Sequence, residues 1–250
     1  MRKFLVFILP AILLSQSGFD IAKMIDNRSM PKDLTNHARM TLTDSKGNSR
    51  DQVMFIKSID KNKKQITWFL EPKDIRGISF LKIKHQKKND EMRMWLPAFK
   101  KVRRISAKKK GDSFMGSDLS YEDLSMRELN NYNYARLEND MIRDTECYVI
   151  KTTPKPELIS SYQKHISWID KTKLTILREH SYDLNGELEK KKEYSYSLIG
   201  IYHVVEKVHV TNIIKSHNTE ILFSNIQVDT EIDESLFRDM SLKRLPYLKQ

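Results

Sequence analysis

A two-residue alternation of apolar and polar residues constrains the fold of this chain more than any other feature. Ala38, Met40 and Leu42 alternate with polar neighbours, and because successive side chains of a strand point to opposite faces, this pattern predicts a strand with one buried face. The turn sequence DSKGN follows, and SRDQVMFIKS runs back with a similar pattern. The two runs together predict an antiparallel hairpin.

Similar runs recur along the whole chain and are joined by short connections. They are KQITWFLEP, ISFLKIKH and EMRMWLP in the first half, and RDTECYVIKTTP, QKHISWIDK, KLTILREHSYD, ELEKKKEYSYSL, YHVVEKVHVTN and TEILFSNIQVD in the second. Short connections favour antiparallel pairing. We therefore expect a mainly β (α+β) fold with about eleven antiparallel strands, beginning as a meander.

Helical patterns are few and short. Apolar residues at helical spacing predict one amphipathic helix near residues 19–30, PKDIRG (72–77) predicts a single helical turn, and ESLFRDM (234–240) predicts a small C-terminal helix. Strands of this number can close as a barrel, stack as a sandwich or curl into a half-barrel. The strand pattern leaves these three architectures open.

The N-terminus has the pattern of a secretory signal peptide. Two basic residues precede an uncharged run over 4–14, and the small residues Ser15 and Ser17 precede the expected cleavage position. The run is too short for a membrane-spanning helix, which needs about 20 residues. We expect a signal peptide over residues 1–17, a single domain over 18–250, and a soluble periplasmic protein.

Charge and cysteine content bear on the partners. Removing the signal peptide lowers the formal net charge from +11 to +9, and basic proteins usually bind polyanions. An exported protein meets anionic lipid head groups, so we expect transient contact with an anionic membrane surface and no binding to nucleic acid. The single cysteine, Cys147, lies in a strand-like run and is expected to be a buried free thiol.

No residue pattern indicates catalysis or a metal centre. His203 and His209 share a strand face but stand about 20 Å apart along it. Ser117 and Ser120 lie in MGSDLSYED, which lacks the G-x-S-x-G sequence of a nucleophile elbow. We therefore expect no enzyme activity, no metal and no cofactor.

The stretch over 95–125 combines a basic run with an apolar insert. Residues 100–110 contain seven basic residues and no acidic one; they predict either a solvated sheet edge or a docking surface for anionic head groups. The insert over 113–124 has too many apolar groups for a surface loop, so it is expected to be a helix-like lid over a pocket. The expected ion pairs between this lid and the basic rim involve Arg103, Arg104, Asp118, Glu122 and Asp123.

Methionine and aromatic residues supply adaptable apolar surface for such a pocket. Strand alternation selects the side chains that would line a lipid cavity. These candidates are Met40, Leu42, Trp68, Leu70, Leu81, Ile83, Met92, Met94, Phe114 and Met115.

The run WLPAFKKVRRIS, followed by SFMGSDLSYEDL, resembles the LolA-like outer-membrane lipoprotein-sorting proteins, in an uncharacterised branch. FLEPKDIRGISFL (69–81), MTLTDSKGN (40–48) and ESLFRDMSLKRL (234–245) support the resemblance, which covers essentially the whole mature chain. It implies an incomplete antiparallel β-barrel wrapped around a few short helices, with an apolar interior for acyl chains. The RR and MGSDLSYEDL segments depart from the carrier pattern and leave the cargo open.

The resemblance implies a periplasmic carrier that binds lipid or the acyl chains of lipoproteins for delivery to the outer membrane. Its partners would be an inner-membrane exporter and an outer-membrane receptor. The alternative is a sensor or accessory subunit of a membrane transporter, or an envelope-stress regulator, on the same scaffold.

Overall fold

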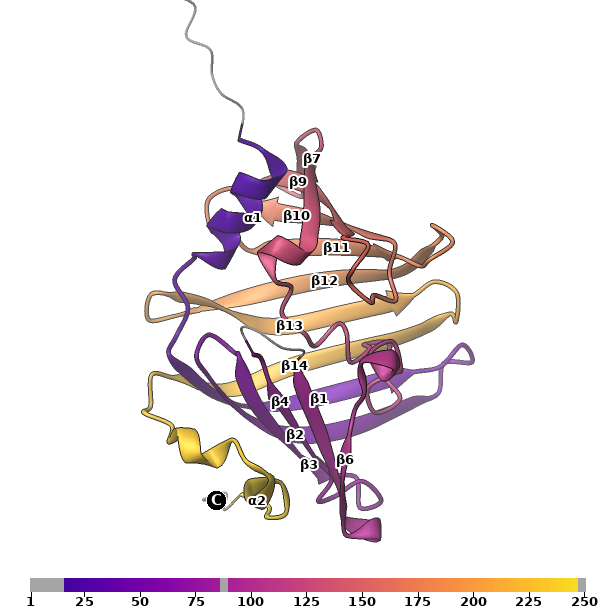
Figure 1. Ribbon diagram of the computed structural model, residues 1–250, viewed down its shortest axis with the longest axis vertical. Helices are drawn as coiled ribbons and strands as arrows, with labels where there is room; N and C mark the ends of the chain where they lie inside the picture. The colour runs from indigo at the N-terminus through magenta and orange to yellow at the C-terminus, as the bar shows by residue number, and fades with distance from the viewer. Residues whose placement is uncertain (1–15, 86–89, 247–250) are drawn as a thin grey trace, which may run out of the picture.

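The computed structural model describes residues 16–85 and 90–246, and its strands form one large antiparallel sheet (Figure 1). Most of the expected signal peptide, residues 1–15, lies outside the described residues. The strands are β1 Asp33–Thr43, β2 Ser49–Ile59, β3 Lys64–Glu71, β4 Ser79–Ile83, β5 Glu91–Leu96, β6 Lys101–Arg104, β7 Tyr132–Arg136, β8 Asp140–Ile142, β9 Thr145–Pro154, β10 Lys164–Asp170, β11 Ile176–Tyr182, β12 Leu188–Ile199, β13 Tyr202–Asn212 and β14 His217–Val228.

The strand order is β6-β5-β4-β3-β2-β1-β14-β13-β12-β11-β10-β9-β7, with β8 paired to β9. Each half of the chain is a meander, and the halves join where β1 pairs antiparallel with β14, with Met40 opposite Ile221. The sheet curls without closing, which confirms the predicted incomplete barrel. Within the described residues it has fourteen strands rather than about eleven, because the short strands β6, β7 and β8 show no alternation long enough to detect.

Helices are short, as expected. Helix α1 (Gly18–Asp26) begins at a capping box in which the Ser17 hydroxyl accepts from the Asp20 N–H, and it buries Ile21 and Ala22 in a cluster with side chains of β9 and β10. Residues 72–77 form a hydrogen-bonded turn. The remaining elements are the 3-10 helices η1 Pro97–Phe99, η2 Ala107–Lys109, η3 Leu129–Asn131 and η4 Glu234–Leu236, and helix α2 Asp239–Leu242.

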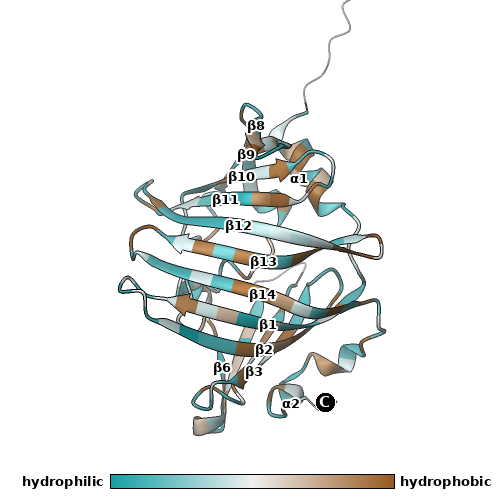
Figure 2. Ribbon diagram, turned by 180° about the vertical axis from the view of Figure 1, so that it is seen from behind, coloured by the Kyte–Doolittle hydropathy of each residue, from teal (hydrophilic) through white to brown (hydrophobic). Residues whose placement is uncertain are grey.

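The two faces of the sheet carry separate apolar cores. On the inner face, side chains from both halves of the sheet pack with residues 105–121. On the outer face, Trp68 and Leu81 pack beneath the C-terminal segment, where the Trp68 indole N–H donates to the Ser241 carbonyl at 3.2 Å. Figure 2 shows this outer side, with α2 beside the end of β3. Strands β3 and β4 therefore carry apolar side chains on both faces.

Residues 105–131, which we call the crossover segment, connect β6 at one edge of the sheet to β7 at the other. This segment crosses the inner face (Figure 1). Its middle part, expected to be helix-like, is built from turns: the Phe114 N–H donates to the Leu119 carbonyl at 2.7 Å, and Met115 and Gly116 have positive φ angles of 52° and 81°. Glycine suits the second of these positions because it has no Cβ to clash there.

Cys147 is a buried free thiol in β9, as the sequence predicted. Burial raises the pKa of its thiol. A high pKa leaves little reactive thiolate, so this cysteine is a small core residue.

Candidate functional site

An apolar cavity of about 300 Å³ lies between the inner face of the sheet and the crossover segment. Strands β1 to β4 contribute one wall, β12 to β14 contribute the opposite wall, and the crossover segment closes one end. The apolar residues that line it are Met30, Pro31, Leu34, Met54, Ile56, Phe114, Leu119, Leu124, Tyr194, Val204, Val205, Val208, Ile221 and Phe223.

The closed end of the cavity is an aromatic cluster centred on Phe114. Its ring lies 5.9 Å from that of Phe69, 5.2 Å from that of Phe80 and 5.8 Å from that of Tyr121, measured between centroids. Tilted and edge-on pairs at these distances add to the stabilisation from burial. Phe114 is only 5% exposed, so this end is a packed wall.

The other end opens near the start of β1 and the β2–β3 turn. The exposed residues Lys32 and Lys61 lie here, and the Arg28 guanidinium donates to the His203 carbonyl at 3.1 Å. We call this end the mouth. It is basic, whereas the interior is mainly apolar.

Polar side chains form a row just inside the mouth. The strand register places Leu34 opposite Ser58, Ser58 opposite Gln65, and Gln65 opposite Lys82. Lys82 is 3% exposed, and its ammonium donates to the Leu124 carbonyl at 2.9 Å. Burial lowers the pKa of Lys82 to about 8, because desolvation disfavours the charged form.

Asn36 lies in the next row, opposite Ile56, and also lines the cavity. It is buried, and its side-chain oxygen has no hydrogen-bond partner within residues 16–85 and 90–246. An unsatisfied buried acceptor costs free energy. A ligand group in the cavity can reach both Asn36 and the polar row.

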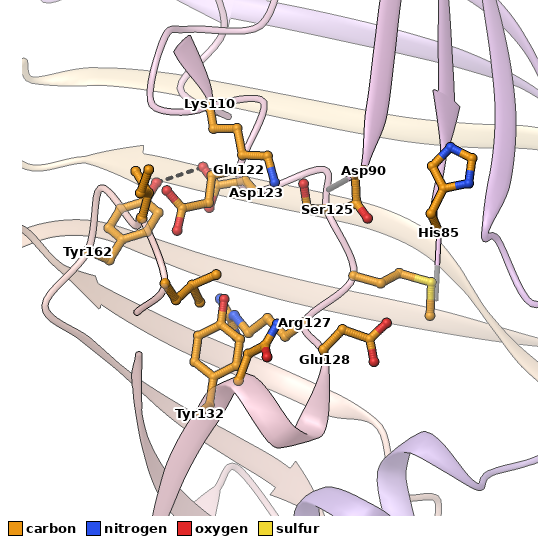
Figure 3. A pocket seen from close by; sticks show the side chains of 14 residues that line it. His85, Asp90, Lys110, Glu122, Asp123, Ser125, Arg127, Glu128, Tyr132 and Tyr162 are labelled. Atoms are coloured by element: carbon orange, nitrogen blue, oxygen red, sulfur yellow. Dashed lines mark hydrogen bonds between the residues drawn. The ribbon is translucent and has the colours of Figure 1, made fainter. Parts of the chain in front are cut away.

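A second cavity, of about 350 Å³, lies on the other side of the crossover segment (Figure 3). Its lining is mostly polar: Glu122 and Lys110 extend from the crossover segment, and Arg127 and Tyr132 lie below them. Asp123 lines both cavities. The crossover segment therefore divides the inner face into an apolar and a polar compartment.

A buried ion network holds the crossover segment to the second half of the sheet. Asp123 contacts Lys192 directly and accepts from the Lys190 ammonium at 3.2 Å and from the Tyr162 hydroxyl at 2.8 Å. Burial alone would raise the pKa of Asp123, but Lys192 and Lys190 more than offset this, so its pKa lies far below the usual range. The carboxylate is therefore ionised.

Glu179 extends the same network on β11. It accepts two parallel hydrogen bonds from Arg127, at 2.6 and 2.8 Å, and one from Lys192 at 3.2 Å. Burial would raise its pKa, yet Arg127 and Lys192 hold it well below the usual value. His165 lies beside this network, and burial together with Arg127 lowers its pKa, so it is neutral at pH 7.

The expected ion pairs between the crossover acids and Arg103 or Arg104 do not form. Asp118 instead accepts from His217 Nδ1 and from the Thr219 hydroxyl, both at 2.7 Å, and Glu122 accepts from the Ser161 N–H at 2.7 Å. Arg104 is 73% exposed and 3.9 Å from Glu91. The acids point inward to the second half of the sheet, whereas the arginines lie on the solvent-exposed edge strand β6.

The predicted cavity residues divide into three groups. Of the ten, Phe114 alone lines the apolar cavity. Five others belong to the inner core beyond its closed end, namely Met40, Leu42, Met92, Met94 and Met115. The last four belong to the outer-face core beneath the C-terminal segment, namely Trp68, Leu70, Leu81 and Ile83. These four side chains were assigned to the inner face but lie on the outer face, which is a one-residue error in the phase of β3 and β4.

Sequence reasoning missed the polar residues of the cavity and the whole wall contributed by β13 and β14. One signal was available for Lys82: it alternates in phase with Phe80, so it shares the inner face. Across the described ranges, no group of three or more histidine, cysteine or acidic residues could hold a metal ion. No described helix is both long enough and apolar enough to cross a membrane.

The curled open sheet, with a covered apolar cavity on its inner face, is a LolA-like fold. A family model described as an uncharacterised protein, the DUF1329 family, matches residues 61–244. The chain belongs to that family. None of the curated proteins compared with this sequence matches it.

Three solved structures are similar to this chain. A domain from Vibrio parahaemolyticus named for outer membrane lipoprotein sorting is 29% identical, with a TM-score of 0.85 over 91% of this chain and 98% of that one. A DUF1329 family protein from Desulfovibrio piger is 27% identical, with a TM-score of 0.85 over 90% and 97%. A LolA superfamily protein from Nitrosomonas europaea, 16% identical with a TM-score of 0.72 over 91% and 100%, has the same fold.

Proposed function

We propose that this protein is a periplasmic carrier that binds an acyl chain of a lipid or lipoprotein in the cavity on its inner face. The observation that carries the proposal is the form of the cavity: apolar along most of its length, blind at Phe114 and open at a basic mouth. Transferring each CH₂ from water into such a site contributes about 0.8 kcal/mol. A volume of 300 Å³ holds roughly ten groups of the size of a water molecule, which corresponds to one short chain.

The sorting role named for the Vibrio domain supports a lipoprotein as one class of cargo. In this role the signal peptide over residues 1–17 exports the chain, and residues 18–250 form a single lipid-binding domain. An inner-membrane exporter would supply the cargo and an outer-membrane receptor would accept it.

We propose that the acyl chain enters through the mouth, and that the crossover segment stays in place. The side chains of Asp118 and Asp123 are 3% exposed or less, and both are bound to side chains from the second half of the chain. Separating a buried ion pair costs several kcal/mol. The crossover segment is therefore a fixed plug. Entry of the acyl chain through the mouth costs less free energy than displacement of this segment.

The β5–β6 hairpin is the proposed contact with an anionic membrane. Phe99 at its turn is 71% exposed, and Lys100, Lys101 and Arg103 beside it are also exposed. An exposed aromatic ring beside basic residues suits a membrane surface, where each basic residue contributes about 1 kcal/mol.

The test compares two tryptophan variants on neighbouring positions of β14. Ile221 is 7% exposed and lines the cavity, whereas Leu222 is 42% exposed. We expect Ile221→Trp to weaken binding of a fluorescent fatty acid at least tenfold and Leu222→Trp to leave it unchanged. Near-UV circular dichroism of both variants checks that they are folded. The proposal falls if delipidated wild-type protein binds no fatty acid and native mass spectrometry of periplasm-purified protein shows no lipid.

A further inference from the structure

We propose that the cavity selects single-chain amphiphiles with an anionic head, a carboxylate or a phosphate, which pairs with the Lys82 ammonium just inside the mouth. This inference rests on the proposed function, because it assumes that the tail occupies the apolar part of the cavity. It adds the chemical class of the head group and the residue that recognises it.

The first argument is that Lys82 lacks a counter-ion. No carboxylate lies within 4.0 Å of its ammonium in the described part of the chain, and the residues outside that part include no Asp or Glu. Within the described residues its ammonium makes one hydrogen bond, to the Leu124 carbonyl, which uses one of three donors. Buried charges are normally paired, so two donors and a full positive charge remain for a ligand.

The carboxylates that line the same cavity cannot supply the missing charge. Asp123 is bound to Lys190 and Lys192. Asp33 accepts from the backbone N–H groups of Thr230 and Glu231 at 2.8 and 2.9 Å. Both carboxylates are already bound to other groups, so an anion that pairs with Lys82 has to come from a ligand.

The charged groups near Lys82 do not neutralise its ammonium. Asp90 raises its pKa and Lys84 lowers it, and both effects are smaller than that of burial. The Lys84 ammonium lies 3.0 Å from Glu128, so that cation is already paired. Among the cations that line the cavity, Lys82 is therefore the buried one without a carboxylate within 4.0 Å in the described residues, whereas Lys32 and Lys61 are exposed at the mouth.

The second argument is that the lining of the cavity changes from polar near the mouth to apolar toward Phe114. The row containing Ser58, Gln65 and Lys82 lies near the mouth, and Met54 lies four residues further along β2. At about 3.3 Å per residue, the apolar part extends roughly 13 Å beyond that row. A head at Lys82 thus leaves room for a tail that reaches toward Phe114.

The third argument is the unpaired side-chain oxygen of Asn36, one row deeper than Lys82. Its side chain can turn to present either its N–H₂ group or its oxygen. It can therefore donate to an anionic oxygen or accept from a hydroxyl group of a ligand in the cavity. A purely apolar ligand would leave both Asn36 and Lys82 unsatisfied.

The experiment measures the affinity of delipidated full-length protein for ligands that are built on a straight chain of ten carbon atoms. Decanoate and decyl phosphate are anionic, decanol is neutral and decyltrimethylammonium is cationic. For wild-type protein we expect both anions to bind at least tenfold more tightly than decanol, and the cation to bind more weakly than decanol. The ratio of decanoate to decyl phosphate affinity identifies whether the head group is a carboxylate or a phosphate.

Three variants test the role of Lys82. Lys82→Met is expected to lower anion affinity to that of decanol without changing decanol affinity, and Lys82→Arg is expected to keep the preference for anions. Lys57→Met is the control, because Lys57 lies over the Phe55 ring on the outer face and should have no effect. If Lys82→Met fails to fold, the wild-type ligand series and Lys82→Arg still decide the question.

The failures of the two proposals are distinguishable. Equal binding of all four ligands, or an unchanged anion preference in Lys82→Met, overturns the selection of anionic heads and leaves the carrier intact. Absence of binding for every ligand overturns the proposed function itself.

Discussion

Replacing Lys82 with methionine should stabilise the protein more at neutral pH than at high pH. At neutral pH the buried ammonium of the wild type is charged and costs free energy, and at high pH it has lost its proton. In the folded protein the pKa of Lys82 falls from 10.5 to about 8, and each pKa unit corresponds to about 1.4 kcal/mol. The charged lysine therefore lowers the free energy of unfolding by about 3 kcal/mol at pH 7. Methionine has a similar length and carries no charge.

The sign follows from proton linkage. Between pH 8 and pH 10.5 the unfolded chain binds a proton at Lys82 that the folded chain has lost, so the wild type gains stability as pH rises through this window. For the two pKa values, the gain between pH 7 and pH 9.5 is about 2 kcal/mol. Lys82→Met lacks this gain, and all other groups titrate alike in both proteins.

Urea unfolding at pH 7 and pH 9.5 measures the effect. The difference in unfolding free energy, wild type minus Lys82→Met, should increase by about 2 kcal/mol between the two pH values. The hydrogen bond to the Leu124 carbonyl contributes a nearly constant offset, which this comparison removes. A difference that stays constant with pH would refute the conclusion that Lys82 is buried without a counter-ion.

Three further outcomes follow from the site. Phe114→Ala should lower the free energy of unfolding by about 3–5 kcal/mol, measured in urea, and should let the cavity accept longer chains, measured with fatty acids of increasing length. Asp123→Asn should cost about 3–5 kcal/mol, since it removes the carboxylate that Lys190 and Lys192 share in a buried network, whereas Glu146→Gln in the more exposed pair with Lys171 should cost under about 1 kcal/mol. Phe99→Ser should leave stability within about 0.5 kcal/mol and weaken sedimentation with anionic vesicles, while neutral vesicles bind neither protein.

The sequence predicted the class of fold because the long strands alternate clearly. In β1, the alternation of Ala38, Met40 and Leu42 matches their burial on the inner face. The edge strands were not predicted, since strands of three to five residues such as β8 and β6 contain too few positions for a period. Their pairing depends on neighbours that only the folded sheet supplies.

The faces of β3 and β4 could not be predicted from their own residues. Trp68 and Phe69 are both buried, because the inner face meets the crossover segment and the outer face meets the C-terminal segment. A strand covered on both sides has no polar face to fix its phase. The outer covering depends on residues near Leu242, more than 150 positions further along the chain.

The predicted ion pairs of the crossover segment were wrong for a similar reason. Sequence proximity suggested that Arg103 would pair with Asp123, but the lysines that bind Asp123 are 67 and 69 positions away. They come close because β12 lies opposite the crossover segment across the inner face. The alternation of Lys190 and Lys192 in β12 marked a cationic face, but nothing in the sequence showed what would cover that face.

The path of the crossover segment has a mechanical consequence for the whole molecule. Because this segment joins the two outermost edges of the sheet, it acts as a tether whose length limits how far the edges can separate. Flattening the sheet would lengthen the span and pull Asp118 and Asp123 from partners on β14 and β12 at the same time. The curvature of the sheet therefore depends on the same segment that carries the buried ion network. A proteolytic cut in this segment would let the edges of the sheet separate and would also free Asp118 and Asp123 from their partners.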